Sequence, residues 1–175
     1  GWGVARHDVM YNDFVIVGPE ADPAGVGGMT DATAALRQIA NSEARFVSRG
    51  DDSGTHRREL ALWDSAQQTP EADWYRAVGA GMGASLNTAA GLGGYILTDR
   101  ASWLNFGNPR GLALLFEGDP VLFNQYSYLS VSPQRHPHVA HATARRLEAW
   151  LSRDAAPLID GYRIDGQRLF TFNAR

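Results

Sequence analysis

The chain has 175 residues, of which 44% are apolar and 20% are charged, so it can form a packed core and is not a disordered chain. A net charge of −3 and the lack of a long Lys/Arg run exclude a broad nucleic-acid surface. The chain has no cysteine, which excludes disulfides, thiolate metal sites and a cysteine nucleophile. No apolar stretch approaches the length that spans a bilayer.

Strands and helices alternate along the first part of the chain. Val9 to Gly18 is rich in β-branched and aromatic residues and predicts a strand. Thr30 or Asp31 can cap a helix that runs to about Glu43. The other elements predicted here are a strand at 46–48, a helix from the following turn to about 68, an ambiguous segment at 74–78, a weak helix at 85–92, a strand at 95–98 and a short helical turn capped by Asp99 or Ser102.

The last third of the chain continues the alternation and ends in a predicted tight turn at Asp165-Gly166. The predicted elements are strands at 112–117 and 121–132 and helices at 139–152 and 155–159. The apolar positions of the longer helix, expected to face inward, are Ala142, Leu147, Trp150 and Leu151. The alternation favours an α/β fold with a mainly parallel sheet.

The segment FVSRGDDSGTHRRE, residues 46–59, places a Ser/Gly/Thr turn between a strand and a helix. The first N–H groups of a helix lack intrahelical partners, and the helix dipole favours an anion there. Hydroxyl and guanidinium donors surround this turn, and glycine allows close approach to the backbone. The candidate ligand-binding residues are Arg49, Ser53, Gly54 and Thr55, with Ser48 as a weaker candidate.

The same turn can be explained as an ordinary capped helix start. Asp52 or Ser53 would then stabilise the helix by about 1 kcal/mol. The basic residues of the segment are nearly matched by acidic ones, so its net charge is close to zero. The turn by itself therefore does not decide between a cap and a binding site.

The wider pattern carries a resemblance to a known family. The segments NDFVIVGP, FVSRGDDSGTH, GMGASL, YILTDRASWL and GDPVLFNQYSYLSVSP occur in this order, between about Val9 and Leu151. Together they resemble the tungstate-binding, periplasmic-type solute receptors of ABC importers, and more loosely the oxyanion receptors for molybdate, sulfate and phosphate. The resemblance implies an α/β, periplasmic-binding-protein-like (type II) fold of two lobes, with the ligand in the cleft between them.

The resemblance also implies a role and a place. The chain would be a non-enzymatic receptor without cofactor or metal, located in the periplasm or at the extracytoplasmic face of a membrane. It would deliver a tetrahedral oxyanion, tungstate or molybdate, to an ABC transporter permease. A sensor domain derived from the receptor fold is an alternative role for the same lobes.

The lobes implied by the resemblance are unequal. Residues 1–18 and 127–175 would form a partial first lobe, and residues 19–126 a nearly complete second lobe. Receptors of this family open with a segment that carries a Thr/Ser-rich oxyanion turn, and no such segment precedes Gly1. We therefore expect a fragment, or a missing part that lies on another polypeptide. An incomplete lobe exposes apolar surface, so we expect self-association.

The residues of the turn bear on which oxyanion binds. A tetrahedral dianion without protons presents only acceptors, so its site must present donors. If Asp51 or Asp52 faced the ligand, a protonated anion such as hydrogen phosphate would be favoured. If both carboxylates bind Arg49 or backbone N–H groups, tungstate or molybdate is favoured. The sequence does not separate tungstate from molybdate.

Two other motifs support alternatives of different classes. GAGMGA, Gly79 to Ala84, matches a loose dinucleotide pattern with Asp99 about twenty residues further on, which would suit a nucleotide-binding α/β enzyme. Arg76 in the preceding segment and the short helix that follows argue against it. A hydrolase would need Ser53 activated by His56, and no third group is evident.

The histidines of HPHVAH could suggest a metal site, because two of them are three residues apart. They are His136, His138 and His141. No carboxylate lies within the cluster, so a solvated helix start is the preferred interpretation.

Overall fold

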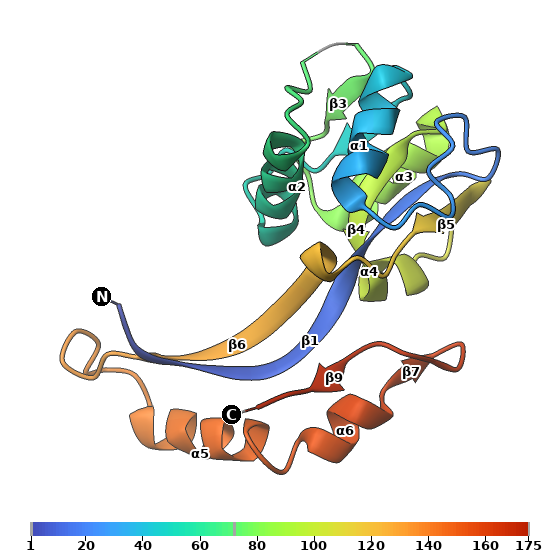
Figure 1. Cartoon of the computed structure of the whole chain (residues 1–175). Helices are drawn as coiled ribbons and strands as arrows, with labels where there is room; N and C mark the ends of the chain where they lie inside the picture. Colours follow the sequence, from blue (N-terminus) through green and yellow to red (C-terminus); the bar gives the residue numbers. More distant parts are fainter. Residues whose placement is uncertain (1, 72, 175) are drawn as a thin grey trace. The chain divides into compact units, whose positions relative to one another are not determined.

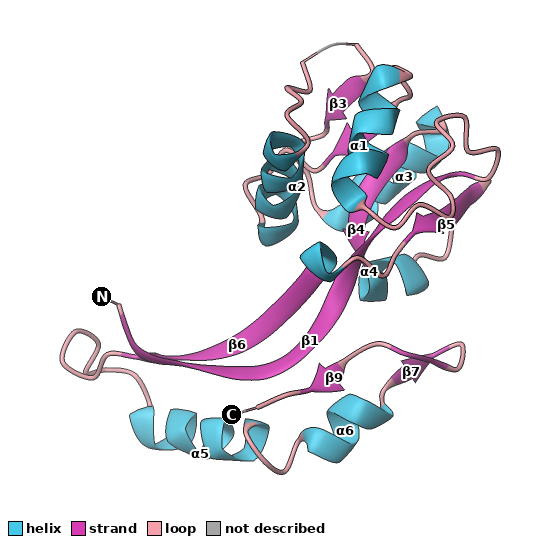
Figure 2. Ribbon diagram, in the orientation of Figure 1, coloured by secondary structure: helices cyan, strands magenta, loops and turns pink. Residues whose placement is uncertain are grey.

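The computed structural model of the chain describes residues 2–71 and 73–174 and shows a mixed α/β structure (Figures 1 and 2). It divides into two compact units. Unit 1 consists of Gly1–Asn12 and Asn124–Arg175, and unit 2 of Asp13–Phe123. The assignment of lobes expected from the sequence stays a prediction.

Unit 2 is built on strands in the order β3-β2-β4-β1-β5. Their bounds are β1 (Gly3–Pro19), β2 (Phe46–Ser48), β3 (Tyr75–Ala77), β4 (Tyr95–Asp99) and β5 (Leu112–Phe116). Strand β2 is parallel to β3 and β4, whereas β1 is antiparallel to β4 and β5. The predicted mainly parallel sheet is therefore wrong. Apolar patterning identifies a strand but not its direction, and β1 lies in the middle of the sheet with its direction reversed.

Helices cover both faces of this sheet (Figure 1). Phe14 and Ile16 of β1 pack in one cluster with α1 (Ala32–Asn41) and α2 (Gly54–Ser65). Val15 and Val17 point to the opposite face and pack with α3 (Met82–Leu92). Successive residues of a strand face opposite sides, so burial of both faces explains the continuous apolar run in NDFVIVGP.

Gly18 of the NDFVIVGP motif cannot carry a side chain, for a steric reason. A Cβ at Gly18 would lie 2.4 Å from Cδ1 of Tyr95, whose ring is fully buried. The Tyr95 hydroxyl donates to Asp22 at 2.7 Å and accepts from the N–H of Ala24 at 2.9 Å, so the ring cannot turn aside without losing these bonds.

Two of the motifs meet through an ion pair at the start of α4 (Arg100–Leu104). Nε and Nη2 of Arg100 donate to the carboxylate of Asp13 at 2.7 and 2.6 Å. Nη2 also donates to Glu117 at 2.5 Å. The NDFVIVGP and YILTDR segments are thus joined by a bidentate contact between residues 87 positions apart. Asp99 caps α4 by accepting from the N–H of Ser102 at 2.9 Å.

Strand β1 continues through both units, and in unit 1 it pairs with two more strands. They are β6 (Phe123–Val131) and β9 (Thr171–Phe172). The unit also holds α5 (His141–Leu151), α6 (Ala156–Gly161) and the hairpin of β7 (Arg163–Ile164) with β8 (Gln167–Arg168). The strand predicted from residue 121 begins instead as a 3-10 turn, η1 (Pro120–Leu122), because Asp119 caps it by accepting from the N–H of Val121.

The apolar face predicted for the helix at 139–152 does not face inward. None of the four residues expected there is buried, and no residue of α5 is. Leu147 is 48% exposed and Trp150 is 42% exposed. Periodicity shows which residues share a face of a helix, but it does not show whether another element covers that face.

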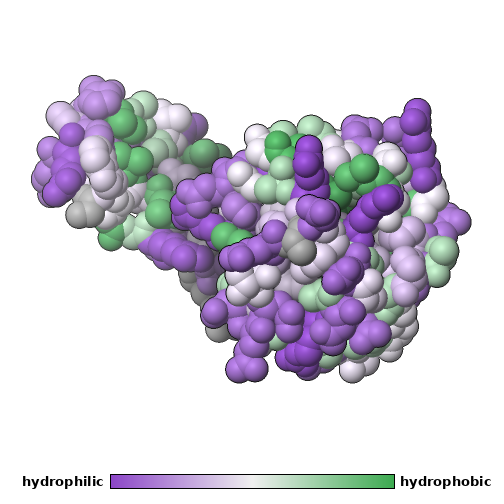
Figure 3. All heavy atoms as spheres, turned by 90° about the horizontal axis from the view of Figure 1, so that it is seen from above, coloured by the Kyte–Doolittle hydropathy of each residue, from purple (hydrophilic) through white to green (hydrophobic). Residues whose placement is uncertain are grey.

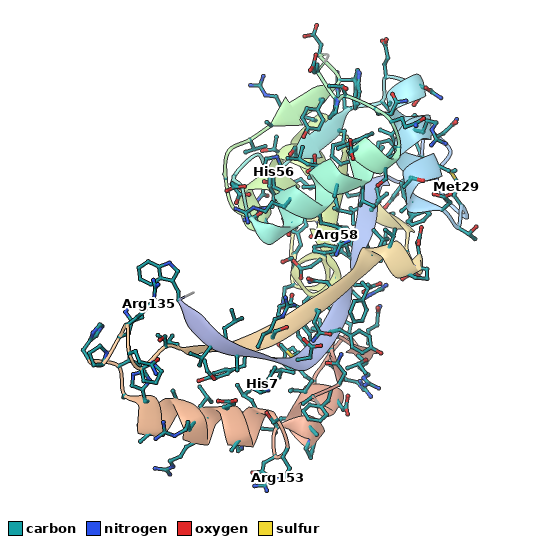
Figure 4. All side chains as sticks on the ribbon, turned by 60° about the vertical axis from the view of Figure 1, so that its left-hand side comes forward. His7, Met29, His56, Arg58, Arg135 and Arg153 are labelled. Carbon is teal, nitrogen blue, oxygen red and sulfur yellow. The ribbon has the colours of Figure 1, made fainter. Side chains whose placement is uncertain are left out.

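Two residues of α5, Ala144 and Glu148, make polar contacts. The hydroxyl of Tyr128 donates to the carbonyl of Ala144 at 3.0 Å, and that of Ser130 donates to Glu148 at 2.9 Å. His7, labelled in Figure 4, also lies 2.9 Å from Glu148. Hydrogen bonds rather than a buried apolar stripe therefore position this helix.

The face of the molecule in Figure 3 is mainly hydrophilic, with smaller apolar patches. In the described part of the chain, no helix has the length and apolar character needed to cross a membrane.

Self-association stays a prediction, and the exposed apolar side chains of unit 1 support it. We expect the sedimentation coefficient of the chain to rise with concentration, because the apolar faces of two copies would cover one another. Trp150→Glu should lower this tendency. A coefficient independent of concentration for the unmodified chain would contradict the prediction.

Candidate functional site

The turn that follows β2 has a backbone that requires glycine at its second residue. Gly50 has φ +60°, and a Cβ there would lie 2.9 Å from Cβ of Ala77. The N–H of Gly50 donates to Oγ of Ser48 at 3.2 Å. The turn is therefore held closely against the neighbouring strand β3, of which Ala77 is the last residue.

Helix α2 starts at the end of this turn with free backbone donors. Ser53 is the N-cap, and its Oγ accepts from the N–H of His56 at 3.3 Å. Gly54 and Thr55 occupy the first two helical positions, whose N–H groups have no intrahelical partner. Among the described residues, no other hydrogen bond reaches these two N–H groups. A Cβ at Gly54 would meet no atom within 4 Å, so a ligand has room to approach.

A second helix start lies beside the first. Because β2 and β3 are parallel, their carboxyl ends are at the same edge of the sheet. The N–H groups of Gly79 and Ala80 donate to the carbonyl of Arg49 at 2.8 and 3.2 Å. Gly81 is the N-cap of α3 without a side-chain cap, and a Cβ there would meet no atom within 4 Å. The glycine-rich segment thus adds a second set of helix N-terminal donors to this edge.

Arg49 and Asp51 form a close pair within the turn. Nη2 and Nε of Arg49 donate to Oδ2 of Asp51 at 2.5 and 3.2 Å. The N–H of Ser53 donates to the other carboxylate oxygen at 3.2 Å. These hydrogen bonds, that of Arg49 above all, hold the pKa of Asp51 well below its ordinary value. In the part of the chain that the structure describes, Nη1 of Arg49 has no hydrogen bond, so it can still donate to a ligand.

Asp52 is paired in the same way on the outer side of the turn. Nε and Nη2 of Arg57 donate to its carboxylate at 2.9 and 2.8 Å, and these bonds lower the pKa of Asp52. Its N–H donates to Nδ1 of His56, which lies in the first turn of α2 (Figure 4), at 3.0 Å. Both carboxylates of the turn are therefore bound to donors. Asp51 binds Arg49 and a backbone N–H group, as the interpretation that favours an unprotonated oxyanion requires, whereas Asp52 binds Arg57 instead.

The structure brings the predicted site residues into one turn, with different exposures. Arg49, Ser53 and Gly54 are partly or fully exposed, whereas Thr55 is 8% exposed and Ser48 is 0% exposed. The hydroxyl of Ser48 lies beneath the turn, where it accepts from Gly50. The assignment of these five residues as ligand-binding stays a prediction.

Glu59 is a residue of this site that the sequence interpretation did not identify. It is 2% exposed and accepts from the hydroxyl of Tyr75 at 2.7 Å and from Nε1 of Trp63 at 3.3 Å. Burial raises its pKa to about 7, although hydrogen bonds from Tyr75, Ser48 and Trp63 act in the opposite direction. The spacing in the sequence could have indicated that Glu59 is buried. Glu59 is four residues after Thr55 and four before Trp63, so the three residues share one buried face of the helix.

The fold does not suit the dinucleotide alternative. A Rossmann phosphate turn follows a central parallel strand. Here Gly79–Ala84 follows β3, a strand of 3 residues at the edge of the sheet with Arg76 and Ala77 exposed.

The catalytic and metal alternatives also lack geometric support. Nδ1 of His56 accepts from Asp52, and Oγ of Ser53 accepts from the backbone of His56, so the His56 ring does not activate that hydroxyl. Residues 2–71 and 73–174 contain no group of three or more His, Asp or Glu placed to hold a metal ion. Nε2 of His141 lies 2.8 Å from the carbonyl of His136, and the rings of His136 and Trp2 stack.

Comparison with known proteins gives consistent matches over most of the chain. The PBP superfamily domain family matches residues 1–154. The tungstate-binding protein TupA of Peptoclostridium acidaminophilum is 42% identical over 99% of this chain. The match covers 63% of that relative, so the chain spans less than two thirds of its length.

Two solved structures are also similar. The tungstate-binding protein TupA from Desulfovibrio alaskensis G20 has a TM-score of 0.85 and 45% identity. The match covers 100% of the present chain and 72% of the Desulfovibrio chain. The tungstate ABC transporter structure from Geobacter sulfurreducens has a TM-score of 0.84 and 44% identity. The match covers 93% of the present chain and 69% of the Geobacter chain. These similarities confirm the predicted α/β, type II periplasmic-binding-protein-like fold and the resemblance inferred from the motifs. The chain belongs to the PBP superfamily domain family.

Proposed function

We propose that this chain is the oxyanion-binding part of an extracytoplasmic solute-binding protein that delivers tungstate to an ABC transporter permease. The observation that carries the proposal is the start of α2, where the N–H groups of Gly54 and Thr55 have no partner among the described residues and follow the turn that holds Arg49. The relatives named tungstate-binding support the choice of ligand. Molybdate has the same shape and charge and is the closest alternative ligand.

The donors of the site suit a tetrahedral dianion. Tungstate carries no protons, so all of its oxygens are acceptors. Gly54 and Thr55 would donate through their N–H groups, Ser53 through its hydroxyl proton, and Arg49 through Nη1. The start of each neighbouring helix, α2 and α3, adds a partial positive charge of about +0.5. Backbone donors held by two helices need little reorganisation when the anion binds.

The carboxylates explain the preference for an unprotonated anion. Hydrogen phosphate also needs an acceptor for its own proton. Asp51 and Asp52 are ionised, and each is bound to an arginine and oriented by the turn. A carboxylate that turned toward the ligand would lose these bonds and repel a dianion.

The proposed function needs no cofactor and no catalytic step. A receptor must bind its anion reversibly and present it to a permease outside the cytoplasm. The relatives that carry ABC transporter names support such a partner. The ring of His56 does not accept from the hydroxyl of Ser53, which supports binding rather than hydrolysis.

Filling the space above the helix start tests the proposal. We expect Gly54→Val to weaken tungstate binding at least tenfold, because its side chain would occupy the space in which the ligand approaches the N–H groups. Folding should be preserved, since Gly54 does not have positive φ and its Cβ would meet no atom within 4 Å. Isothermal titration calorimetry with tungstate, molybdate and phosphate measures the affinities.

A matched control separates ligand crowding from the loss of a glycine. Gly91, in α3, also has free space around an added Cβ, so Gly91→Ala should leave tungstate affinity unchanged. Absence of tungstate binding by the unmodified chain, or tighter binding of phosphate, would refute the proposed ligand. Unaltered binding by Gly54→Val would refute the proposed position.

A further inference from the structure

Glu59 occupies an unusual place directly behind the candidate site. It lies five residues after Gly54, which corresponds to about 7–8 Å along the axis of α2. Its carboxyl group connects α2 to β3 by accepting from Tyr75, and the hydroxyl of Ser48 at the end of β2 acts to lower its pKa. Ser48 in turn accepts from the N–H of Gly50. Glu59 is therefore linked through the polar side chain of Ser48 to the turn that holds Arg49.

We infer that Glu59 is a positioning residue whose protonation state controls the anion affinity of the turn, so that affinity rises when the carboxyl group is protonated. The inference rests on the proposed function. A buried carboxylate behind the site would repel an incoming dianion through a medium of low dielectric. Protonation would remove that charge, and the neutral group can still bond its neighbours.

No opposite charge offsets this carboxylate. Its neighbours are the Tyr75 hydroxyl from β3, the Ser48 hydroxyl from β2 and the indole N–H of Trp63 from its own helix. Among the described residues, Glu59 forms no salt bridge. The arginines of the turn are bound to Asp51 and Asp52, so they do not neutralise it.

The buried position also predicts how pH acts without any ligand. The pKa of Glu59 is raised from 4.5 to about 7 by burial, so the folded chain holds this proton more tightly than the unfolded chain. The stability that comes from the protonated group is fully present below pH 4.5 and is lost as pH rises through about 7. Above that pH, the folded state contains an unpaired buried charge.

The experiment compares the unmodified chain with Glu59→Gln, which keeps the shape but not the charge. Tungstate affinity of the unmodified chain should fall about tenfold between pH 6 and pH 8.5, whereas Glu59→Gln should change less than twofold. Without ligand, raising the pH over this range should lower the melting temperature of the unmodified chain by about 5 °C more than that of Glu59→Gln. The amide NMR shifts of Gly50 and Gly54 should titrate near pH 7 in the unmodified chain alone.

His56 supplies the matched control, because its ring lies in the same turn and accepts a hydrogen bond from the N–H of Asp52. The ligand-free titration of the Gly50 and Gly54 amides should persist in His56→Gln. If the titration of these amides disappears in His56→Gln, or if it persists in Glu59→Gln, Glu59 is not the controlling group. The inference is then wrong, whether or not tungstate binds. If the amides follow Glu59 and tungstate does not bind at any pH, the proposed function fails while the link between Glu59 and the turn stands.

Discussion

Replacing Trp63 with alanine is expected to lower the free energy of unfolding by about 4 kcal/mol, because truncation of a fully buried Trp removes apolar burial and leaves a cavity. Trp63 is 1% exposed, and its ring centroid lies 5.0 Å from that of Phe46 and 5.7 Å from that of Trp74. Both contacts are edge-to-face, the geometry that aromatic pairs prefer. The substitution also removes the indole donor from Glu59, which would lose one of its partners in a buried position.

Urea denaturation followed by far-UV circular dichroism measures this effect. Trp150→Ala is the matched control, because Trp150 is 42% exposed on α5 and its truncation should cost less than about 1 kcal/mol. Similar losses for the two variants would show that the packing of Trp63 against Phe46 and Trp74 does not stabilise the chain as the structure indicates.

Replacing Arg49 with alanine is expected to weaken tungstate binding about 100-fold. The substitution removes a charge-assisted donor, which contributes about 1.5–3 kcal/mol. It also frees the carboxylate of Asp51 from its arginine, so a negative charge remains unpaired beside the anion. Arg49→Lys should give an intermediate loss, because lysine keeps the charge but cannot bond Asp51 and the ligand with one planar group.

Titration calorimetry with two further variants separates the two causes. In the double variant Arg49→Ala/Asp51→Asn, affinity should recover in part, since the unpaired carboxylate is gone. Arg57→Ala should change the tungstate affinity only a few-fold, because the Arg57–Asp52 pair is exposed to solvent. The side chain of Arg57 is 69% exposed and that of Asp52 is 78% exposed. An unchanged tungstate affinity in Arg49→Ala would exclude Arg49 from the binding site.

The local features of the site could be predicted because each depends on neighbouring residues. A helix cap needs only a side-chain oxygen and the N–H groups two or three residues later, and Ser53 and Asp31 provide these. The strand at 46–48, the turn and the helix start were therefore evident in FVSRGDDSGTHRRE. The pairing of Asp51 with Arg49 also spans two residues, and the sequence interpretation included it as one of two outcomes.

The features that were missed depend on residues far apart in the chain. The sequence shows Ser48 as a polar strand end and Glu59 as a charged helix residue, yet both are buried in the folded chain, where Tyr75 and Trp63 donate to Glu59. The place of Gly79 and Ala80 was also missed, because it depends on the parallel register of β2 and β3, which puts their N–H groups on the carbonyl of Arg49.

The amino-acid sequence by itself determined the strand, turn and helix start at 46–59, the cap at Ser53 and the family, because those are set by local backbone chemistry and by the order of motifs. Only the tertiary structure decided the reversed direction of β1, the outward face of α5 and the burial of Glu59. Burial and strand direction are properties of what packs against a residue, and a local pattern is compatible with more than one set of neighbours. The buried carboxyl group of Glu59 behind the turn is therefore visible only in the folded structure, in which β2 and β3 lie side by side.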